Sequence, residues 1–474
     1  MMQVEAGAPG ADGAFRAAAA EHDNAVRLPP PPKTVAETGL ERSLIIELVC
    51  KVMLSTGRMH LPVLTGRLRL SINVLREVLG CMVAEQLVEV ASRGDSDLDV
   101  YYQLTSMGKR AAADCLSRCR YAGPAPVTLA AYRELVLRQS LQHAQRGAVR
   151  SADLNAAFAD DVVEADVRNL LGAALQSSRS LLLYGPSGSG KTTLARKLGQ
   201  LQQGLVAVPF AILVDQDIVL VHDPLLHLPP TLAQARASDE RRGSDSRWAL
   251  CQRPVIQVGA ELDSAMLDLR YDEAGGVYQA PPHLMANNGM LLVDDFGRQT
   301  MGTADLFNRW AAPLDTGADH LSLNGGHKVG VPFDVTLVFA TNLSPQLLLD
   351  DSSMRRLGYK IHVGALSDAN YRTLFRRECR RARIACHEDV LDDLVTRLHR
   401  GSGRELLACY PRELLGRVAD FASFAGVEPR LTEATLEQAW SSMFALCPAG
   451  AVASSQPSVS FLAESGDPLL ERIS

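Results

Sequence analysis

The stretch GPSGSGKTT, residues 185–193, constrains the fold of this chain more than any other part of its sequence. An apolar run, SRSLLLYG, leads into it, and TTLARKLGQ, which has a helical pattern, follows it. In a strand, glycine-rich loop and helix, successive backbone N–H groups point at one anion, and the helix dipole favours negative charge there. Lys191 adds a point charge for terminal phosphates, and the Thr192 hydroxyl is a ligand for Mg²⁺. The pattern predicts a nucleotide-binding loop made of Gly185, Pro186, Ser187, Gly188, Ser189, Gly190, Lys191, Thr192 and Thr193.

A second motif, GMLLVDDFGRQ at residues 289–299, allows two interpretations. Its Asp295-Phe296-Gly297 is the metal-binding triplet of a protein kinase. Its four apolar residues followed by Asp294 and Asp295 are typical of the second half of a P-loop ATPase site. A kinase also needs an H-R-D catalytic loop, which this sequence does not contain. We therefore expect Asp294 to hold Mg²⁺ and Asp295 to polarise the water that attacks ATP.

Four further polar side chains are candidates for the same site. The apolar strand DVTLVFATN ends at Asn342, whose amide either holds the water and the γ-phosphate or caps the strand. Arg355 and Arg356 precede a short last strand, where they either serve the γ-phosphate of a neighbouring subunit or form a solvated face. Arg412 stands in the first turn of a helix that begins at Pro411. A cation there opposes the helix dipole, so Arg412 either faces a phosphate that offsets this cost or is solvated at the surface.

Strand and helix signals alternate from residue 176 to residue 365, as a parallel α/β sheet requires. With 474 residues, of which 47% are hydrophobic, the chain is long enough for two or three domains with cores. The predicted divisions are a disordered tail at 1–38, a winged-helix-like domain at 39–122, a helical linker at 123–175, the α/β nucleotide-binding core at 176–365, a helical lid at 366–446 and a flexible tail at 447–474.

The winged helix-turn-helix domain is predicted from three helical segments followed by two short strands and a closing helix. Such a domain often binds DNA, but residues 41–120 hold eleven Lys or Arg against nine Asp or Glu, a net charge of only +2. The helix SINVLREVLGCMVA offers Asn73 and Arg76 as base readers. Arg67 and Arg69, just before that helix, favour DNA. We expect this domain to bind protein and keep DNA as the alternative partner.

Together, the phosphate loop, the double-acid strand, the FATN strand, the paired arginines and the helical lid resemble an AAA+ ATPase over residues 160–446. A Gly325-Gly326 hairpin directly before the Asn342 strand resembles the pre-sensor hairpin branch, which includes MoxR-like and magnesium-chelatase-like ATPases. The phrases DDFGRQ, PFD, TNL, RR and YKI are similar to bacterial AAA family ATPases labelled as ATPases with chaperone activity.

The resemblance implies a role for each candidate residue. The roles are Walker A for residues 185–193, Walker B for Asp294 and Asp295, sensor 1 for Asn342, arginine finger for Arg356 with Arg355 as the alternative, and sensor 2 for Arg412. Many AAA+ proteins carry Glu at the position of Asp295, which is one methylene shorter and leaves the rate of turnover open. Tyr271 and Tyr278 are either a substrate-gripping pore loop or core aromatics.

From these observations we expect a cytoplasmic ATPase that uses ATP and Mg²⁺ and assembles into a homo-oligomer, a hexameric ring. The sequence has neither a signal-peptide pattern nor an uncharged apolar stretch long enough for a membrane span, so no membrane partner is expected. The leading hypothesis is remodelling of a protein client with chaperone-like action. The alternatives are a DNA-associated ATPase in transcription or transposition and a slow nucleotide-dependent switch.

Overall fold

The computed structural model describes residues 28–94, 99–141, 151–159, 161–202, 204–232, 234 and 243–444. It divides the chain into two compact units, Met1–Leu366 and Ser367–Ser474. The predicted tail at 447–474 lies outside the described residues. The predicted tail at 1–38 differs from the structure at its end, because helix α2 (Val35–Thr38) forms there and its Val35 N–H donates to Glu77.

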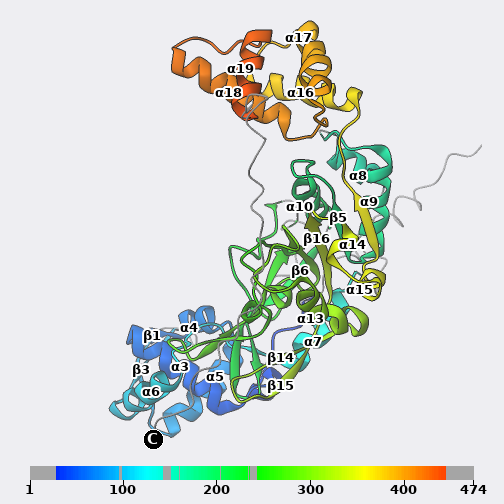
Figure 1. Cartoon of the computed structure of the whole chain (residues 1–474). Helices are drawn as coiled ribbons and strands as arrows, with labels where there is room; N and C mark the ends of the chain where they lie inside the picture. The colour runs from blue at the N-terminus through cyan, green and yellow to red at the C-terminus, as the bar shows by residue number, and fades with distance from the viewer. Residues whose placement is uncertain are drawn as a thin grey trace, which may run out of the picture. The chain divides into compact units, whose positions relative to one another are not determined.

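A five-stranded, all-parallel sheet forms the centre of the first unit (Figure 1). Its strand order is β10-β13-β16-β5-β17. The strands are β5 (Leu181–Tyr184), β10 (Val255–Val258), β13 (Gly289–Val293), β16 (Val335–Thr341) and β17 (Tyr359–His362). Every residue of β13 and β16 is buried, as expected for inner strands covered on both faces. The predicted α/β fold with a parallel sheet is thus confirmed.

The two faces of this sheet have separate hydrophobic cores, because neighbouring residues of a strand point to opposite sides. Met290 and Leu292 of β13 pack with helices α9 (Ala165–Ser177) and α10 (Lys191–Leu201). Leu291 and Val293 pack with helix α13 (Thr303–Thr316) on the other face. The remaining short helices of this unit are α8 (Ser151–Ala157), η2 (Ala265–Leu267), α12 (Pro282–Met285), α14 (Pro345–Leu348) and α15 (Asp351–Arg356).

A second, mixed sheet follows the order β11-β12-β8-β7-β4, and two antiparallel strand pairs accompany it. Its strands are β4 (Val127–Thr128), β7 (Ala211–Val214), β8 (Asp217–Leu220), β11 (Arg270–Asp272) and β12 (Val277–Gln279). The accompanying pairs are β6 (Leu205–Pro209) with β9 (Trp248–Gln252), and β14 (Ala318–Ser322) with β15 (Lys328–Pro332). The β14–β15 pair is the hairpin predicted around Gly325. These strands share one hydrophobic core with helix α7 (Leu129–Gln139).

The N-terminal domain has the predicted order of three helices, two wing strands and a closing helix, with one further short strand, β1, pairing with the wing. Its elements are α3 (Arg42–Thr56), β1 (Met59–His60), α4 (Leu61–Leu68), α5 (Ile72–Ala84), β2 (Val88–Arg93), β3 (Val100–Leu104) and α6 (Ser106–Arg118). Ser71 and Thr105 start α5 and α6 as N-caps, each accepting a backbone N–H of the first turn. The wing tip at 95–98 lies outside the described residues.

A buried ion pair joins the N-terminal domain to the second sheet. Arg247 donates to the Asp245 carboxylate, with its Nη2 at 2.8 Å, and both side chains are at most 6% exposed. Its Nη1 also donates to the carbonyl oxygens of Thr38 and Pro126, at 3.1 and 3.2 Å. The guanidinium therefore satisfies acceptors from three separate segments of the chain.

The second unit is helical, as the sequence predicted. It contains α16 (Asp368–Ala382), α17 (Glu388–Asp393), a π-helical turn η3 (Leu394–Arg400), α18 (Tyr410–Ala425) and α19 (Glu433–Met443). His399 lies in its core, where Tyr371 hydrogen-bonds its Nε2 at 2.8 Å and Trp440 meets its ring edge-on. Burial lowers the pKa of His399 to about 4, so this ring is neutral at physiological pH.

In the part of the chain that the structure describes, no helix is both long enough and apolar enough to span a membrane.

We predict that Arg247→Ala lowers the free energy of unfolding by about 3–5 kcal/mol, because it leaves the Asp245 carboxylate buried without its cation. Denaturant unfolding followed by fluorescence measures the loss. The matched control is Arg138→Ala, which removes an ion pair whose side chains are 53% and 70% exposed and should have a far smaller effect. Equal losses for the two variants would contradict a structural role for the buried pair.

Candidate active site

The phosphate loop connects β5 to α10, as predicted. Gly185 follows the strand with φ at 143°, and a Cβ there would lie 2.2 Å from the carbonyl oxygen of Val363. Gly190, with φ at 98°, is the N-cap of α10. Both positions therefore require glycine, the first for space and the second for its left-handed backbone. Residues Pro186, Ser187 and Gly188 lie within the loop, and Thr193 lies in the first turn of α10.

Two polar groups of this loop, the Lys191 ammonium and the Ser189 hydroxyl, have no anionic hydrogen-bond partner among the described residues. Lys191 donates to the carbonyl oxygens of its own loop, Gly185 at 3.0 Å and Pro186 at 2.8 Å. Burial lowers the pKa of Lys191, although the nearby Asp294 and Asp295 oppose this shift. The buried Ser189 hydroxyl has no hydrogen-bond partner among the described residues. An ammonium on backbone carbonyls and an orphaned hydroxyl both fit a loop built for an anionic ligand.

The Mg²⁺ ligands predicted from sequence lie together. The Thr192 hydroxyl donates to Asp294 Oδ1 at 2.9 Å, although 102 residues separate them. The other carboxylate oxygen, Oδ2, accepts from Gln257 Nε2 at 3.0 Å. Gln257 in turn accepts from Arg196 Nε at 2.8 Å. A hydroxyl and a carboxylate oxygen are the hard oxygen ligands that Mg²⁺ prefers.

Asp295 lies one residue beyond this carboxylate and is exposed, with a left-handed backbone at φ of 48°. The next residue, Phe296, is 1% exposed and packs on Phe339 of β16, with ring centroids 4.7 Å apart. The phenylalanine of the kinase-like triplet is thus a core residue of a P-loop sheet. Gly297 completes the turn.

Asn342 follows β16, which lies between the P-loop strand β5 and the acid strand β13. Thr341 performs the capping at this strand end, since its hydroxyl donates to the Phe296 carbonyl and accepts the Leu343 N–H. The structure shows no side-chain hydrogen bond for Asn342 to any described residue. Its amide is therefore free to bind water or phosphate at this edge.

The two arginines of α15 differ in their surroundings. Arg356 donates through Nε to Asp315 of α13 at 2.9 Å and through Nη1 to Ser352 at 3.2 Å. Arg355 is exposed and makes no side-chain contact of this kind within the described part of the chain. Because an exposed ion pair is weak, Arg356 can exchange Asp315 for another partner at little cost. Arg412 lies in the second unit, exposed in the first turn of α18.

Reasoning from sequence missed two side chains of this region and left the role of a tyrosine pair open. Gln257 and Gln299, which contact the acid segment, gave no motif signal. Tyr278, one of two pore-loop candidates, is 3% exposed in the core of the second sheet, and its hydroxyl accepts the Asn324 N–H. The partly buried Tyr271 packs on it with ring centroids 4.9 Å apart and ring planes tilted by 53°, which favours the core interpretation for this pair.

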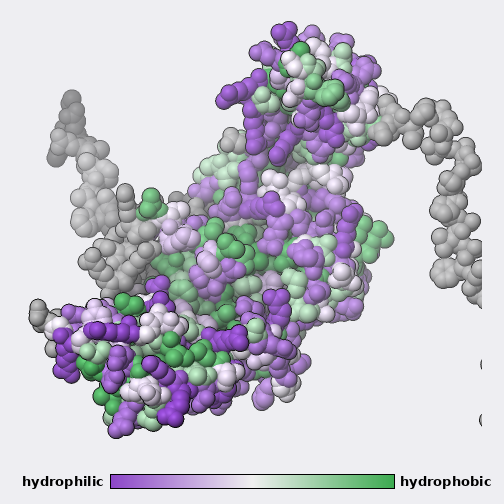
Figure 2. Space-filling view, turned by 90° about the vertical axis from the view of Figure 1, so that its left-hand side faces the viewer, coloured by the Kyte–Doolittle hydropathy of each residue, from purple (hydrophilic) through white to green (hydrophobic). Residues whose placement is uncertain are grey.

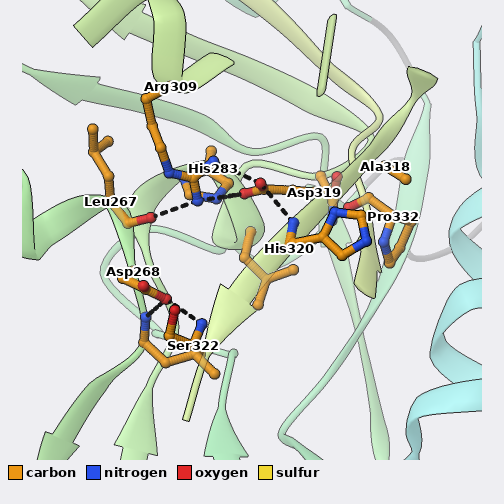
Figure 3. Close-up of polar contacts among 12 residues, drawn as sticks. Leu267, Asp268, His283, Arg309, Ala318, Asp319, His320, Ser322 and Pro332 are labelled. Atoms are coloured by element: carbon orange, nitrogen blue, oxygen red, sulfur yellow. Dashed lines mark hydrogen bonds and ion pairs between the residues drawn. The ribbon is translucent and has the colours of Figure 1, made fainter. Parts of the chain in front are cut away.

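A buried charged cluster holds the β14–β15 hairpin to neighbouring helices (Figure 3). Asp319 of β14 accepts from Arg309 of α13 at 2.6 and 2.9 Å and from His283 Nε2 of α12 at 2.8 Å. Burial alone would raise the pKa of Asp319, but hydrogen bonds from His283 and Arg309 hold it below its ordinary value. Asp268 adds a bond to the Ser322 N–H at 2.6 Å. This cluster fixes the hairpin just before β16.

Comparison with known proteins gives limited help. Residues 367–442 match a domain of unknown function, DUF8689. No curated protein matches the chain. Among solved structures, NtrX from Brucella abortus in complex with ATP is similar at 15% identity and a TM-score of 0.37, with 59% of this chain and 55% of that chain covered. The Thermotoga maritima RuvB Holliday junction branch migration motor gives 15% identity, a TM-score of 0.33, and 58% and 68% coverage. This chain thus spans about half of the NtrX chain.

We predict that Asp295→Asn retains ATP binding but slows hydrolysis by about 10²–10⁴-fold, because an amide cannot accept the proton of the attacking water. ATP affinity is measured by titration and turnover by phosphate release. Asp215→Asn is the matched control, since Asp215 is also exposed with a positive φ, of 53°, but lies in the turn between β7 and β8. Normal hydrolysis by Asp295→Asn would place the catalytic carboxylate elsewhere.

Proposed function

We propose that this chain is a cytoplasmic AAA+ ATPase that binds ATP with Mg²⁺ and hydrolyses it. The observation that carries the proposal is the bond from Thr192 to Asp294, which brings the predicted metal ligands of two distant motifs together beside Lys191. The sheet order supports it, because β16 places Asn342 between the P-loop and the acid pair. The β14–β15 hairpin before β16 favours the pre-sensor hairpin branch.

Each residue then has a defined task. Lys191 exchanges two carbonyl oxygens for phosphate oxygens, which carry a full negative charge, and Ser189 gains an acceptor for its hydroxyl. Thr192 and Asp294 would hold Mg²⁺, which neutralises charge on the transferring phosphoryl group. Asp295 orients and deprotonates the water, and the Asn342 amide holds the water against the γ-phosphate.

Arginines in the last turn of α15 support a ring. In the resemblance to AAA+ proteins, such an arginine completes the site of the adjacent copy. Arg355 is exposed, and the partners that Arg356 would release, Asp315 and Ser352, are both exposed. We therefore include assembly into a homo-oligomeric, hexameric ring in the proposal. Arg412 of the helical lid is proposed as the second phosphate sensor.

The client is proposed to be a protein, because the N-terminal domain is poorly prepared for DNA. The N-terminal end of α5 is occupied by the chain itself, since Ser71 donates to the Pro32 carbonyl and Glu77 accepts the Val35 N–H. Arg69, a main argument for DNA, stacks its guanidinium over the Phe210 ring at 5.3 Å.

The accessible surface of this domain also favours a protein partner. Exposed apolar side chains lie on three of its helices, Val63 on α4, Val83 on α5 and Met107 on α6, each 40–47% exposed. Hydrophobic patches are interspersed with hydrophilic residues on the lowest part of Figure 2, which is this domain. Mixed polar and apolar surface suits a protein interface better than a phosphate backbone.

The Arg356→Ala protein is expected to bind ATP but to hydrolyse it about 10³–10⁵-fold more slowly. This is the usual effect of removing an arginine that one protein supplies to the nucleotide of another. Mixing it with Lys191→Ala protein should restore part of the activity, because some interfaces then combine an intact Lys191 with an intact Arg356. Arg355→Ala is tested in parallel to decide which arginine acts. Full activity of both single variants, unchanged by mixing with Lys191→Ala protein, would contradict a site shared between subunits.

The full chain is expected to bind random duplex DNA weakly or not at all at physiological salt, and its ATPase rate should not change when DNA is added. Fluorescence anisotropy and phosphate release measure the two effects. A sub-micromolar affinity that falls steeply with salt and weakens in Arg67→Ala would overturn the protein-client proposal. The DNA-associated ATPase would then replace it.

A further inference from the structure

The segment that follows the acid strand is held by one glutamine side chain. Gln299 Nε2 lies 3.1 Å from the Asp294 carbonyl oxygen, 3.3 Å from that of Asp295 and 3.3 Å from that of Gly259. Its Oε1 accepts the Gly297 N–H at 2.9 Å. The amide thus bridges both acidic residues, the turn after them and the segment after β10.

The residue at the centre of this bridge has an unfavourable backbone. Asp295 has φ of 48°, in the left-handed region that non-glycine residues seldom occupy. Such a conformation persists only where surrounding contacts over-determine it. On one side of Asp295 the chain is fixed by β13, and on the other by Phe296, whose N–H donates to the Ala340 carbonyl at 2.8 Å. Gln299 is the side chain that binds the Asp295 carbonyl itself.

We propose that Gln299 is a positioning residue for hydrolysis, which holds the left-handed turn at Asp295 and thereby aims its carboxylate at the attacking water. The proposal rests on the proposed ATPase function. Gln299 touches no reacting atom and acts only through the backbone of Asp294 and Asp295. Its effect should therefore appear in the hydrolysis step rather than in nucleotide binding, which Lys191 and Thr192 provide.

The chemistry of the site explains why the residue is a glutamine. The amide donates toward carbonyl oxygens and accepts an N–H at the same time, and among side chains of this length only glutamine does both. In Gln299→Glu the carboxylate still accepts from Gly297 but faces three carbonyl oxygens without a proton to share. In Gln299→Met the shape is retained and all of these bonds are lost.

The experiment compares Gln299→Glu and Gln299→Met with the wild type and with Gln252→Ala. Gln252 is the matched control because its Nε2 also donates to a carbonyl oxygen, that of Pro229 at 2.9 Å, but from β9 of the separate β6–β9 pair. ATP dissociation constants, kcat from phosphate release at saturating ATP and Mg²⁺, and thermal midpoints are measured for each full-length protein.

For both Gln299 variants we expect ATP affinity within about threefold of wild type and kcat lower by about 10²-fold, the order reached when a catalytic group moves by about 1 Å. Gln299→Glu should be the slower of the two, and Gln252→Ala should match the wild type. If Gln299→Glu fails to fold, Gln299→Met decides.

Two results would overturn the proposal while leaving the ATPase function intact. One is a wild-type kcat in Gln299→Met. The other is a lower thermal midpoint together with weaker ATP binding, while kcat at saturating ATP stays unchanged. Gln299 would then have only a structural role. Absence of phosphate release by the wild type itself would instead overturn the proposed function, and the role of Gln299 with it.

Discussion

The hydrogen bond between Thr192 and Asp294 depends on the order of strands in the central sheet, and the rest of the site depends on this bond. Thr192, in the first turn of α10, and Asp294, directly after β13, are 102 positions apart in the sequence, and they meet because β5 and β13 are both parallel neighbours of β16. Parallel strands place their carboxyl ends at one edge, so every loop that leaves the sheet there contributes to one site. The P-loop, the acid pair and Asn342 are three such loops.

The opposite ends of β13 and β16 are held by helix α7 and the residue that follows it. Asn288, just before β13, donates to Asp334, just before β16, at 2.6 Å and to the Val136 carbonyl of α7 at 2.8 Å. Gln139, the last residue of α7, donates to Asn288 at 3.3 Å, and Ser140 donates to Asp334 at 2.8 Å. Buried polar groups of this kind are costly to separate, so α7 and the starts of β13 and β16 form one firmly connected assembly.

The sequence was sufficient where a motif places chemistry at fixed spacing. The glycine pattern at 185–193, the apolar run before Asp294 and the apolar run before Asn342 each specify a strand and the loop that follows it, and the structure has all three. The helices and wing strands of the N-terminal domain were also predicted, because the spacing of apolar residues in each element reflects which of its faces is buried. These predictions need no knowledge of how distant segments meet.

Contacts between segments that are distant in the sequence could not be predicted from sequence patterns. Gln257 contacts Asp294 because β10 pairs with β13, and strand order is not encoded in either strand. Arg69 had the charge expected for DNA, yet its stacking on Phe210 follows from packing between two domains. The start of the N-terminal domain was placed too late, because residues 28–38 are polar and proline-rich in sequence but bind α5 and the loop at Asp245.

The choice of aspartate at position 295, where the resembled family commonly has glutamate, has a physical explanation in the backbone. A φ of 48° disfavours most side chains, but Asp and Asn tolerate the left-handed region better than Glu does. Aspartate therefore stabilises the turn that Phe296 and Gln299 define, while its shorter side chain brings the carboxylate nearer to the backbone. A glutamate at this position would extend the reach by one methylene but would strain the turn that aims it. Backbone conformation and side-chain length at residue 295 are thus linked, and the shorter acid is consistent with the loop that this sequence builds.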